Sequence, residues 1–279
     1  SVGRVMTCVL GMIVNREREI RSFTKTPFYR VIGNFNLQEK PFTAEWRAVE
    51  GSKYYNSPVL YKENGFKKKE DAERLIGELS AEPAGPATVI GIEKKKENKN
   101  APLLYNLAEL QNDCSKYFKI SPDETLRIVQ ELYEKKMTTY PRTDARVLST
   151  AVAKEIHKNI GGLRNYALAA PFAKEVLEQG TYKNIAKTRY VNDKQITDHY
   201  AIIPTGQGLN NLAGLAPTAA KVYEVIVRRF LSIFYPPAVY QKFSLTLQVK
   251  EESFFASFKV LIQEGYLKVT DFSFKKENT

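Results

Sequence analysis

Apolar and polar residues alternate with two different periods along the chain, and the change of period divides it into three parts. Over 27–49 and 88–92, and again over 239–249 and 254–262, the pattern is typical of antiparallel β-strands. Between 101 and 235 apolar residues mostly recur every three or four positions, which favours helices. The order β, α, β predicts an α+β chain in which a helical domain is inserted between two parts of one β-rich domain.

Helical spacing is clearest over 107–118 and 121–136. The second helix begins with three start signals: Ser121 can cap it, Pro122 suits the first helical position, and Glu124 completes a capping box. These two helices and the extended segment after them predict a helix-turn-helix-like unit that presents the extended segment at its rim. Further helices are predicted over 5–13, 71–79, 152–160 and 218–234.

The patterns also predict where the domains begin and end. Residues 1–22 are predicted to be a helical segment. Residues 23–100 and 236–279 are predicted to form the discontinuous β-rich domain, and 101–235 the mainly helical domain. The charged run 94–100 is a candidate linker between the last two.

The sequence has 279 residues, of which 43% are hydrophobic and 26% charged, and this composition is typical of a soluble globular protein. An excess of 42 Lys and Arg over 31 Asp and Glu gives a net charge of +11, which favours a polyanionic partner. The two cysteines, Cys8 and Cys114, lie in apolar helical patterns and are predicted to be free buried thiols. Because no basic-then-apolar leader and no membrane-length apolar run occurs, we expect a cytoplasmic protein without a membrane contact.

Candidate chemistry is concentrated around Tyr140, where a phenol, a guanidinium and a carboxylate lie within five residues: Tyr140, Arg142 and Asp144. Pro141 favours an extended backbone, so Tyr140 and Arg142 should project to the same side. One phosphate could then contact a nucleophilic phenol oxygen and a guanidinium that stabilises phosphoryl charge. The alternative is a half-buried tyrosine beside a surface arginine, and these residues alone favour that alternative.

Three motifs together change this balance. The run at 140–145 resembles the Tyr-Pro-Arg-Thr-Asp-Ser active-site segment of the type IA DNA topoisomerases, with Ala145 in place of the serine. Residues 1–7 resemble the Ser-Ala-Gly-Arg-Val-Gln-Thr motif of the same family, and 199–205 resemble its His-His-Ala-Ile-Ile-Pro-Thr motif. The three occur in the family's order, and the chain is similar to the topoisomerase III branch in particular.

The resemblance implies a gate-type arch: 1–22 would be part of the DNA-strand-binding domain, the β-rich part would form the arch, and the helical part would carry the active-site tyrosine. It implies that Tyr140 cleaves one DNA strand and keeps its 5′ phosphate as a phosphotyrosine ester. Another strand is then passed and the break is religated without ATP. The implied partner is DNA, especially single-stranded or negatively supercoiled, and the implied location is the nucleoid.

Residue roles carry over only through the matching motifs. Arg142 and His199 would join Tyr140 as catalytic residues, because a guanidinium neutralises the phosphate and an imidazole can donate to it or move a proton. Asp144 and Thr143 would support them. The implied DNA contacts are Arg4, Lys136, Arg146 and Thr205. Arg228 and Arg229 are interpreted as either exposed charges or DNA backbone contacts.

The family also implies Mg²⁺, held by an Asp-x-Asp-x-Glu cluster in a separate N-terminal Toprim domain. No such pattern occurs in this sequence, and Glu70-Asp71-Ala72-Glu73 is a poor substitute. We therefore expect no metal bound to this chain. We interpret the chain as a central fragment that depends on its Toprim domain and is inactive alone in DNA relaxation.

Two other functions remain open. A non-catalytic single-stranded DNA-binding module would use basic residues and aromatic rings such as Tyr54, Tyr55 and Tyr190 as stacking platforms. Such a module has no need of a phenol, a guanidinium and an imidazole together. A tyrosine nuclease or relaxase would need a metal-binding histidine cluster, which two histidines cannot build.

Overall fold

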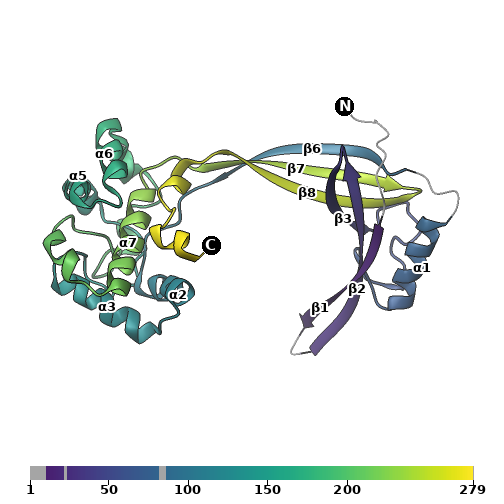
Figure 1. Ribbon diagram of the computed structural model, residues 1–279, viewed down its shortest axis with the longest axis horizontal. Coiled ribbons are helices and arrows are strands. Elements are labelled where there is room, and N and C mark those ends of the chain that lie inside the picture. Colours follow the sequence, from purple (N-terminus) through teal and green to yellow (C-terminus); the bar gives the residue numbers. More distant parts are fainter. Residues whose placement is uncertain (1–10, 22–23, 82–85, 279) are drawn as a thin grey trace. The chain divides into compact units, whose positions relative to one another are not determined.

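The computed structural model describes residues 11–21, 24–81 and 86–278 (Figure 1), with side chains from 28 to 275 outside 82–85. The chain divides into two compact units. Unit 1 comprises Ser1–Glu97 and Tyr240–Val260, and unit 2 comprises Asn98–Val239 and Leu261–Thr279. The segment Leu261–Thr279, predicted from the sequence to belong to the β-rich domain, is assigned to unit 2.

Unit 1 is built on one eight-stranded sheet with the order β4-β5-β2-β3-β8-β7-β6, in which β1 also pairs with β2. The strands are β1 (Gly11–Arg21), β2 (Thr24–Leu37), β3 (Lys40–Arg47), β4 (Leu60–Lys62), β5 (Gly65–Phe66), β6 (Thr88–Lys99), β7 (Ala238–Val249) and β8 (Glu252–Gln263). The pairs β1–β2, β2–β3 and β3–β8 are antiparallel. Within the described residues of this unit there is one helix, α1 (Lys69–Ser80), which buries Ala72, Leu75 and Leu79.

One prediction about this unit is wrong. Gly11–Arg21 is a strand, so the helical segment expected over 1–22 is contradicted there; residues 1–10 and 22 lie outside the described residues. The reason is tertiary, because β1 pairs along its whole length with β2, from Gly11↔Asn34 to Arg21↔Thr24. The candidate linker at 94–100 contains the boundary between the two units, which falls between Glu97 and Asn98. Residues 94–99 of this run are the end of β6, where Glu97 bonds to Lys259 (3.0 Å) of β8.

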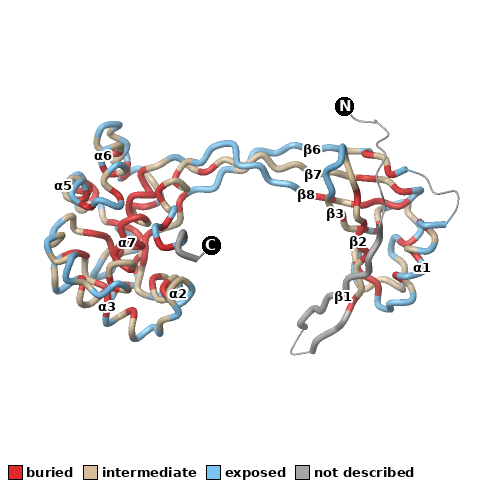
Figure 2. The backbone as a smooth tube through the Cα atoms, in the orientation of Figure 1, coloured by how far each residue is buried: buried red, intermediate tan, exposed pale blue. Residues whose placement is uncertain are grey.

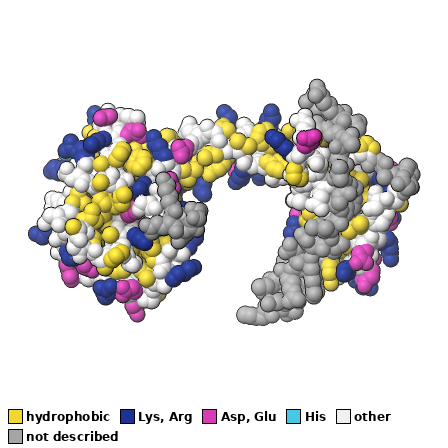
Figure 3. Space-filling model, in the orientation of Figure 1, with side chains coloured by type: hydrophobic (Ala, Val, Ile, Leu, Met, Phe, Trp, Pro, Cys, Tyr) yellow, Lys and Arg dark blue, Asp and Glu magenta, His cyan; other side chains and the backbone are white. Residues whose placement is uncertain are grey.

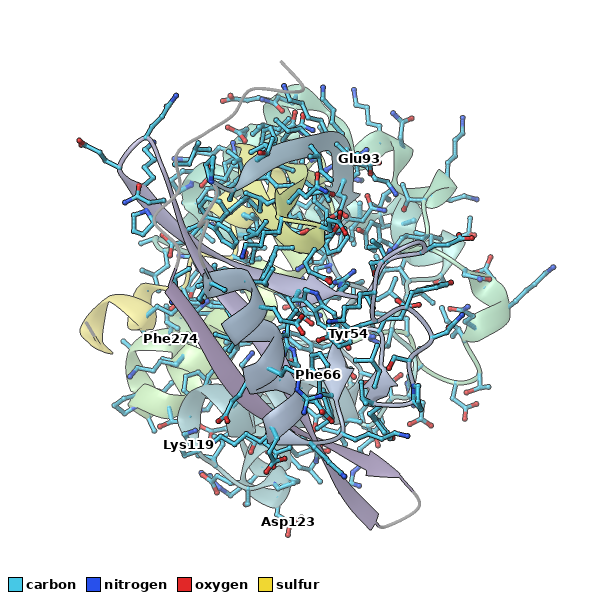
Figure 4. All side chains as sticks on the ribbon, turned by 90° about the vertical axis from the view of Figure 1, so that its right-hand side faces the viewer. Tyr54, Phe66, Glu93, Lys119, Asp123 and Phe274 are labelled. Atoms are coloured by element: carbon cyan, nitrogen blue, oxygen red, sulfur yellow. The ribbon has the colours of Figure 1, made fainter. Side chains whose placement is uncertain are left out.

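The core of unit 1 combines aliphatic side chains with a group of aromatic rings around Trp46, which is fully buried. Its ring stacks on Phe66 with centroids 4.9 Å apart, and Tyr54 meets it edge-on at 5.9 Å. Tyr54 and Phe66 are labelled in Figure 4, and their ring centroids lie 5.5 Å apart. The alternating apolar positions of β3 thus supply the core, as the sequence pattern predicted.

Unit 2 is mainly helical. Its α-helices are α2 (Leu107–Phe118), α3 (Pro122–Glu134), α4 (Thr150–Lys154), α5 (Ile156–Gly162), α6 (Ala170–Gln179) and α7 (Pro217–Ser232). Its 3₁₀ turns are η1 (Leu163–Asn165), η2 (Thr181–Lys187), η3 (Asp193–Gln195), η4 (Leu209–Gly214), η5 (Gly265–Lys268) and η6 (Ser273–Asn278). Helix α7 is the centre of the unit and is mostly buried (Figure 2).

Several local predictions for unit 2 are confirmed. Ser121 caps α3 by accepting a hydrogen bond from the Glu124 N–H (3.1 Å), and α2 contacts α3. Cys114 is buried and free, whereas Cys8 lies outside the described residues. The helix expected over 152–160 is interrupted at Glu155, which separates α4 from α5.

Arg228 and Arg229 are neither exposed nor available to DNA. Arg228 is 5% exposed, pairs with Glu224 (2.8 Å) on the same helix and donates to the Val269 carbonyl (2.9 Å). Arg229 pairs with Asp113 (3.1 Å) and donates to the Leu103 carbonyl (2.8 Å). Both guanidiniums therefore fasten α7 to its neighbours inside unit 2, and our interpretation of them was wrong.

A buried carboxyl in unit 1 predicts a pH-dependent stability. Glu252 is 5% exposed and accepts a hydrogen bond from the Trp46 indole (2.9 Å). Burial raises the pKa of Glu252, and the Trp46 bond only partly opposes this. A carboxyl whose folded pKa is raised contributes its full stability at low pH and loses it as the pH rises through that pKa.

We therefore expect Glu252→Gln to have a higher free energy of unfolding than the wild type at pH 8, with the difference shrinking towards about pH 4. Urea unfolding followed by fluorescence of Trp46, the only tryptophan, measures it. The control is Glu251→Gln at the exposed neighbouring position. The same difference at both pH values would contradict the expectation.

Candidate active site

Two segments far apart in the sequence run side by side in unit 2 and form the base of the site. They are 137–147, which contains Tyr140, and 199–205, which contains His199. Thr138 and Pro204 form an antiparallel bridge. Backbone hydrogen bonds run from Thr139 N to Ile203 O (2.9 Å), from Thr205 N to Met137 O (3.0 Å) and from Ala201 N to Val147 O (3.1 Å).

Two threonine hydroxyls strengthen this pairing on either side of Tyr140. The Thr139 hydroxyl donates to the Ala201 carbonyl (3.1 Å) and accepts from the Ile203 N–H (3.0 Å). The Thr143 hydroxyl donates to the His199 carbonyl (3.1 Å), and Thr143 is only 7% exposed. The backbone of His199 is thus held directly by the Tyr140 segment.

The end of α3 determines how the chain enters the site. Lys136 adopts a left-handed conformation (φ 62°), its N–H bonds to the Tyr133 carbonyl (2.9 Å), and the Met137 N–H bonds to the Leu132 carbonyl (2.9 Å). These two bonds form a Schellman motif, with Leu132 and Met137 buried beneath it. The chain reverses here, so Tyr140 returns to the last turn of α3.

The outcome is a cluster of rings in an open cleft of about 720 Å³. The Tyr140 and His199 ring centroids are 4.4 Å apart with a 39° interplanar angle. Tyr133 meets Tyr140 nearly edge-on, at 5.3 Å and 79°. The cleft is lined by Tyr133, Glu134, Lys136, Thr138, Thr139, Tyr140, His199, Tyr200, Thr205 and Gln207. Tyr140 is half-buried and His199 is exposed, so a ligand can reach both.

The other predicted residues divide into two groups. Lys136 and Thr205 line the cleft, and the Thr205 hydroxyl donates to the Lys136 carbonyl (2.6 Å). Arg142 and Asp144 are exposed, and their side chains have no hydrogen-bond or ion-pair partner among the residues that the structure describes. Arg146 donates to the Leu104 carbonyl (3.1 Å), and Arg4 lies outside the described residues.

Two cleft residues were missed by the sequence interpretation. Tyr133 looked like one more apolar position of α3, yet it is 39% exposed. Tyr200 stands at the second histidine of the family motif, and burial raises its pKa. The signal in the sequence was proximity: Tyr133 lies seven residues before Tyr140, and Tyr200 directly follows His199.

Comparison with known proteins identifies the family. The family model described as "DNA topoisomerase" matches residues 1–279, which is the whole chain. The chain belongs to the type IA DNA topoisomerase family. The motifs at 140–145 and 199–205 are two of the three on which the resemblance rests, and Tyr140, His199, Tyr200 and Thr205 from them line one cleft. The third motif, at 1–7, lies outside the described residues.

Curated relatives of this topoisomerase chain are named DNA topoisomerase 3. The protein from Bacillus thuringiensis (strain Al Hakam) is 32% identical over 281 residues, which cover 100% of this chain and 35% of the relative. That from Bacillus subtilis (strain 168) is 32% identical over 272 residues, covering 97% and 34%. The chain thus spans about a third of the length of these relatives.

A solved structure shows the same fold. Full-length topoisomerase I from Thermotoga maritima matches with a TM-score of 0.54 and 19% identity, over 95% of this chain and 37% of that one. The α+β class predicted from the order of patterns is therefore confirmed.

Among the residues that the structure describes, the acidic side chains do not fit a magnesium site. Within the part of the chain that the structure describes, no group of three or more His, Cys, Asp or Glu side chains could hold a metal ion. In the Glu70–Glu73 run, Asp71 pairs with Arg74 (3.5 Å) and Glu73 with Lys69 (3.7 Å).

None of the helices in the described ranges is long and apolar enough to cross a membrane.

Residues 204–206, at one wall of the cleft, pack against helix α5. The Asn159 amide donates to the Pro204 carbonyl (3.0 Å). A Cβ atom on Gly162 would lie 2.0 Å from the Gly206 carbonyl oxygen, far inside contact distance. Gly206 itself has a positive φ of 81°. The approach of α5 to this loop therefore requires glycine, and it fixes where Thr205 lies.

We expect Gly162→Ala to lower the free energy of unfolding by about 1–3 kcal/mol, because the loop must move to admit the methyl group. Gly161→Ala is the matched control: its methyl would come no closer than 3.9 Å to Arg164, and alanine favours a helix by roughly 0.5–1 kcal/mol. Urea unfolding followed by circular dichroism compares them. Equal stabilities of the two variants would show that the loop has room to shift.

Proposed function

We propose that this chain supplies the DNA-cleaving tyrosine of a type IA topoisomerase, the function predicted for Tyr140. The observation that carries the proposal is the Tyr140 ring packed 4.4 Å from His199 in an open cleft. The Tyr140 oxygen forms a bond to a backbone phosphorus, and the bond from that phosphorus to the 3′ oxygen breaks. The phenol loses its proton and the 3′ oxygen gains one.

The ester then preserves the energy of the broken bond. The 5′ phosphate stays on Tyr140 while another strand passes, and attack by the 3′ hydroxyl restores the DNA without ATP. A tyrosine hydroxyl is a weak nucleophile at neutral pH, so its surroundings must help. We assign that help to His199, which donates to the phosphate or moves the proton.

The remaining predicted residues take roles that suit their positions. Arg142 is exposed beside the cleft segment and would neutralise the scissile phosphate, with Asp144 orienting it once DNA is bound. Thr143 holds the His199 backbone. Lys136 and Thr205 would contact DNA in the cleft. Arg146 and Arg4 stay predicted DNA contacts, although two carbonyls already engage the Arg146 guanidinium.

Charge supports a nucleic-acid partner. The net charge is +11, and Lys and Arg side chains are spread over the face of unit 2 drawn in Figure 3. We propose DNA in the bacterial cytoplasm, single-stranded or negatively supercoiled, as this partner.

The rival single-strand-binding module loses much of its support. Tyr54 is 8% exposed and donates to Glu78 (3.1 Å), and Tyr190 is 7% exposed and donates to the Ala101 carbonyl (2.6 Å). Neither ring is open for a base to stack on. Of the three proposed platforms only Tyr55, 39% exposed, is accessible.

We propose that the complete enzyme uses Mg²⁺ held by a Toprim domain, which would stabilise charge at the leaving oxygen. Since no acidic cluster in the described residues fits a metal, this chain alone should not relax DNA.

We expect the 279-residue chain to bind single-stranded DNA weakly and to leave negatively supercoiled plasmid unrelaxed with Mg²⁺, as assayed on agarose gels. Efficient relaxation by the purified chain would refute this part of the proposal.

The nucleophile is tested in the complete enzyme. Tyr140→Phe removes one oxygen, so it should abolish the covalent adduct with a 3′-labelled single-stranded oligonucleotide while changing the dissociation constant less than about threefold. Tyr182→Phe, at a ring beside His157 and outside the cleft, is the control and should form adduct normally. Labelled adduct from the Tyr140 variant on denaturing gels would reassign the nucleophile.

A further inference from the structure

The orientation of the Tyr140 ring is set by other rings. In the described part of the chain its hydroxyl makes no hydrogen bond, so nothing polar fixes the phenol. His199 lies against the ring at 4.4 Å, and Tyr133 closes another side at 5.3 Å in a nearly perpendicular arrangement. Edge-to-face contact is the geometry that aromatic pairs favour.

Tyr133 is well anchored at its backbone and expendable for the core. Its carbonyl accepts the Lys136 N–H in the Schellman motif, and the adjacent Leu132 is fully buried. The Tyr133 ring itself is 39% exposed on the cleft wall. A large exposed aromatic ring that contributes little to the core, yet contacts the proposed nucleophile, needs another explanation.

We propose that Tyr133 is a positioning residue for strand cleavage: its ring holds the Tyr140 phenol in the orientation from which the oxygen attacks phosphorus. The inference rests on the proposed function. Tyr133 touches neither the phosphate nor the leaving oxygen in this role, and its own hydroxyl is dispensable.

The physical basis is the geometric demand of the attack. Reacting atoms must lie about 3–3.5 Å apart and be aligned, and a side chain that samples other orientations reaches this geometry less often. A perpendicular ring pair contributes about 1 kcal/mol, so loss of the Tyr133 ring should slow cleavage about fivefold at 1.36 kcal/mol per factor of ten. DNA affinity should stay unchanged, because the contact is made equally with and without DNA.

The test compares Tyr133→Leu, which loses the ring, with Tyr133→Phe, which keeps it, in the complete enzyme. Single-turnover cleavage of a 3′-labelled single-stranded oligonucleotide gives the rate constant of adduct formation, and titration gives the dissociation constant. We expect Tyr133→Leu to be about fivefold slower with the dissociation constant unchanged. Tyr133→Phe should restore the rate to within about twofold. Tyr182→Leu, a ring loss outside the cleft, controls for general effects.

The outcomes separate this inference from the function on which it rests. Wild-type rates in Tyr133→Leu, with Tyr140→Phe inactive, would overturn the positioning role alone. Equal slowing in Tyr133→Phe and Tyr133→Leu would assign the effect to the hydroxyl and overturn it too. A higher dissociation constant, large enough to account for the slower rate, would make Tyr133 a DNA-binding residue. Adduct formation by Tyr140→Phe would instead overturn the proposed function.

Discussion

The pairing of 137–147 with 199–205 is the constraint on which the site depends. It brings a phenol and an imidazole from distant parts of the sequence to a centroid separation of 4.4 Å. Backbone bonds alone would fix the register, and the hydroxyls of Thr139 and Thr143 add cross-links on both sides of Tyr140. Ordering this long connection costs conformational entropy, which the buried residues beneath the pairing offset.

In the two paired segments, the residues that anchor the backbone are different from those that face the cleft. Ile202, Ile203 and Met137 are buried to 1% exposure or less and anchor the two segments, while Tyr140 and His199 face the cleft. Lys136 departs from the rule that glycine fills a left-handed helix end, at a cost of about 1 kcal/mol. In return a cation lies in the cleft lining, a position that suits a phosphate.

The sequence predicted what local chemistry and periodicity determine. The Ser121 cap, the alternating residues of β3 and the β, α, β order depend on near neighbours, and all are present. It failed where tertiary partners decide. Gly11–Arg21 is a strand because β2 pairs with it, and Arg228 is buried because Glu224 neutralises it. The motif resemblance indicated Tyr140 and His199, but Tyr133 required the turn geometry after α3.

The central claim is that the Tyr140 oxygen takes the 5′ end of a broken DNA strand. Mass spectrometry of the adduct tests it most directly: the complete enzyme reacts with a single-stranded oligonucleotide, and nuclease and protease digestion leaves a nucleotide on one peptide. Our account predicts that this nucleotide is joined through its 5′ phosphate to Tyr140. A nucleotide on Tyr133, Tyr200 or any other residue, or one joined through a 3′ phosphate, would contradict it.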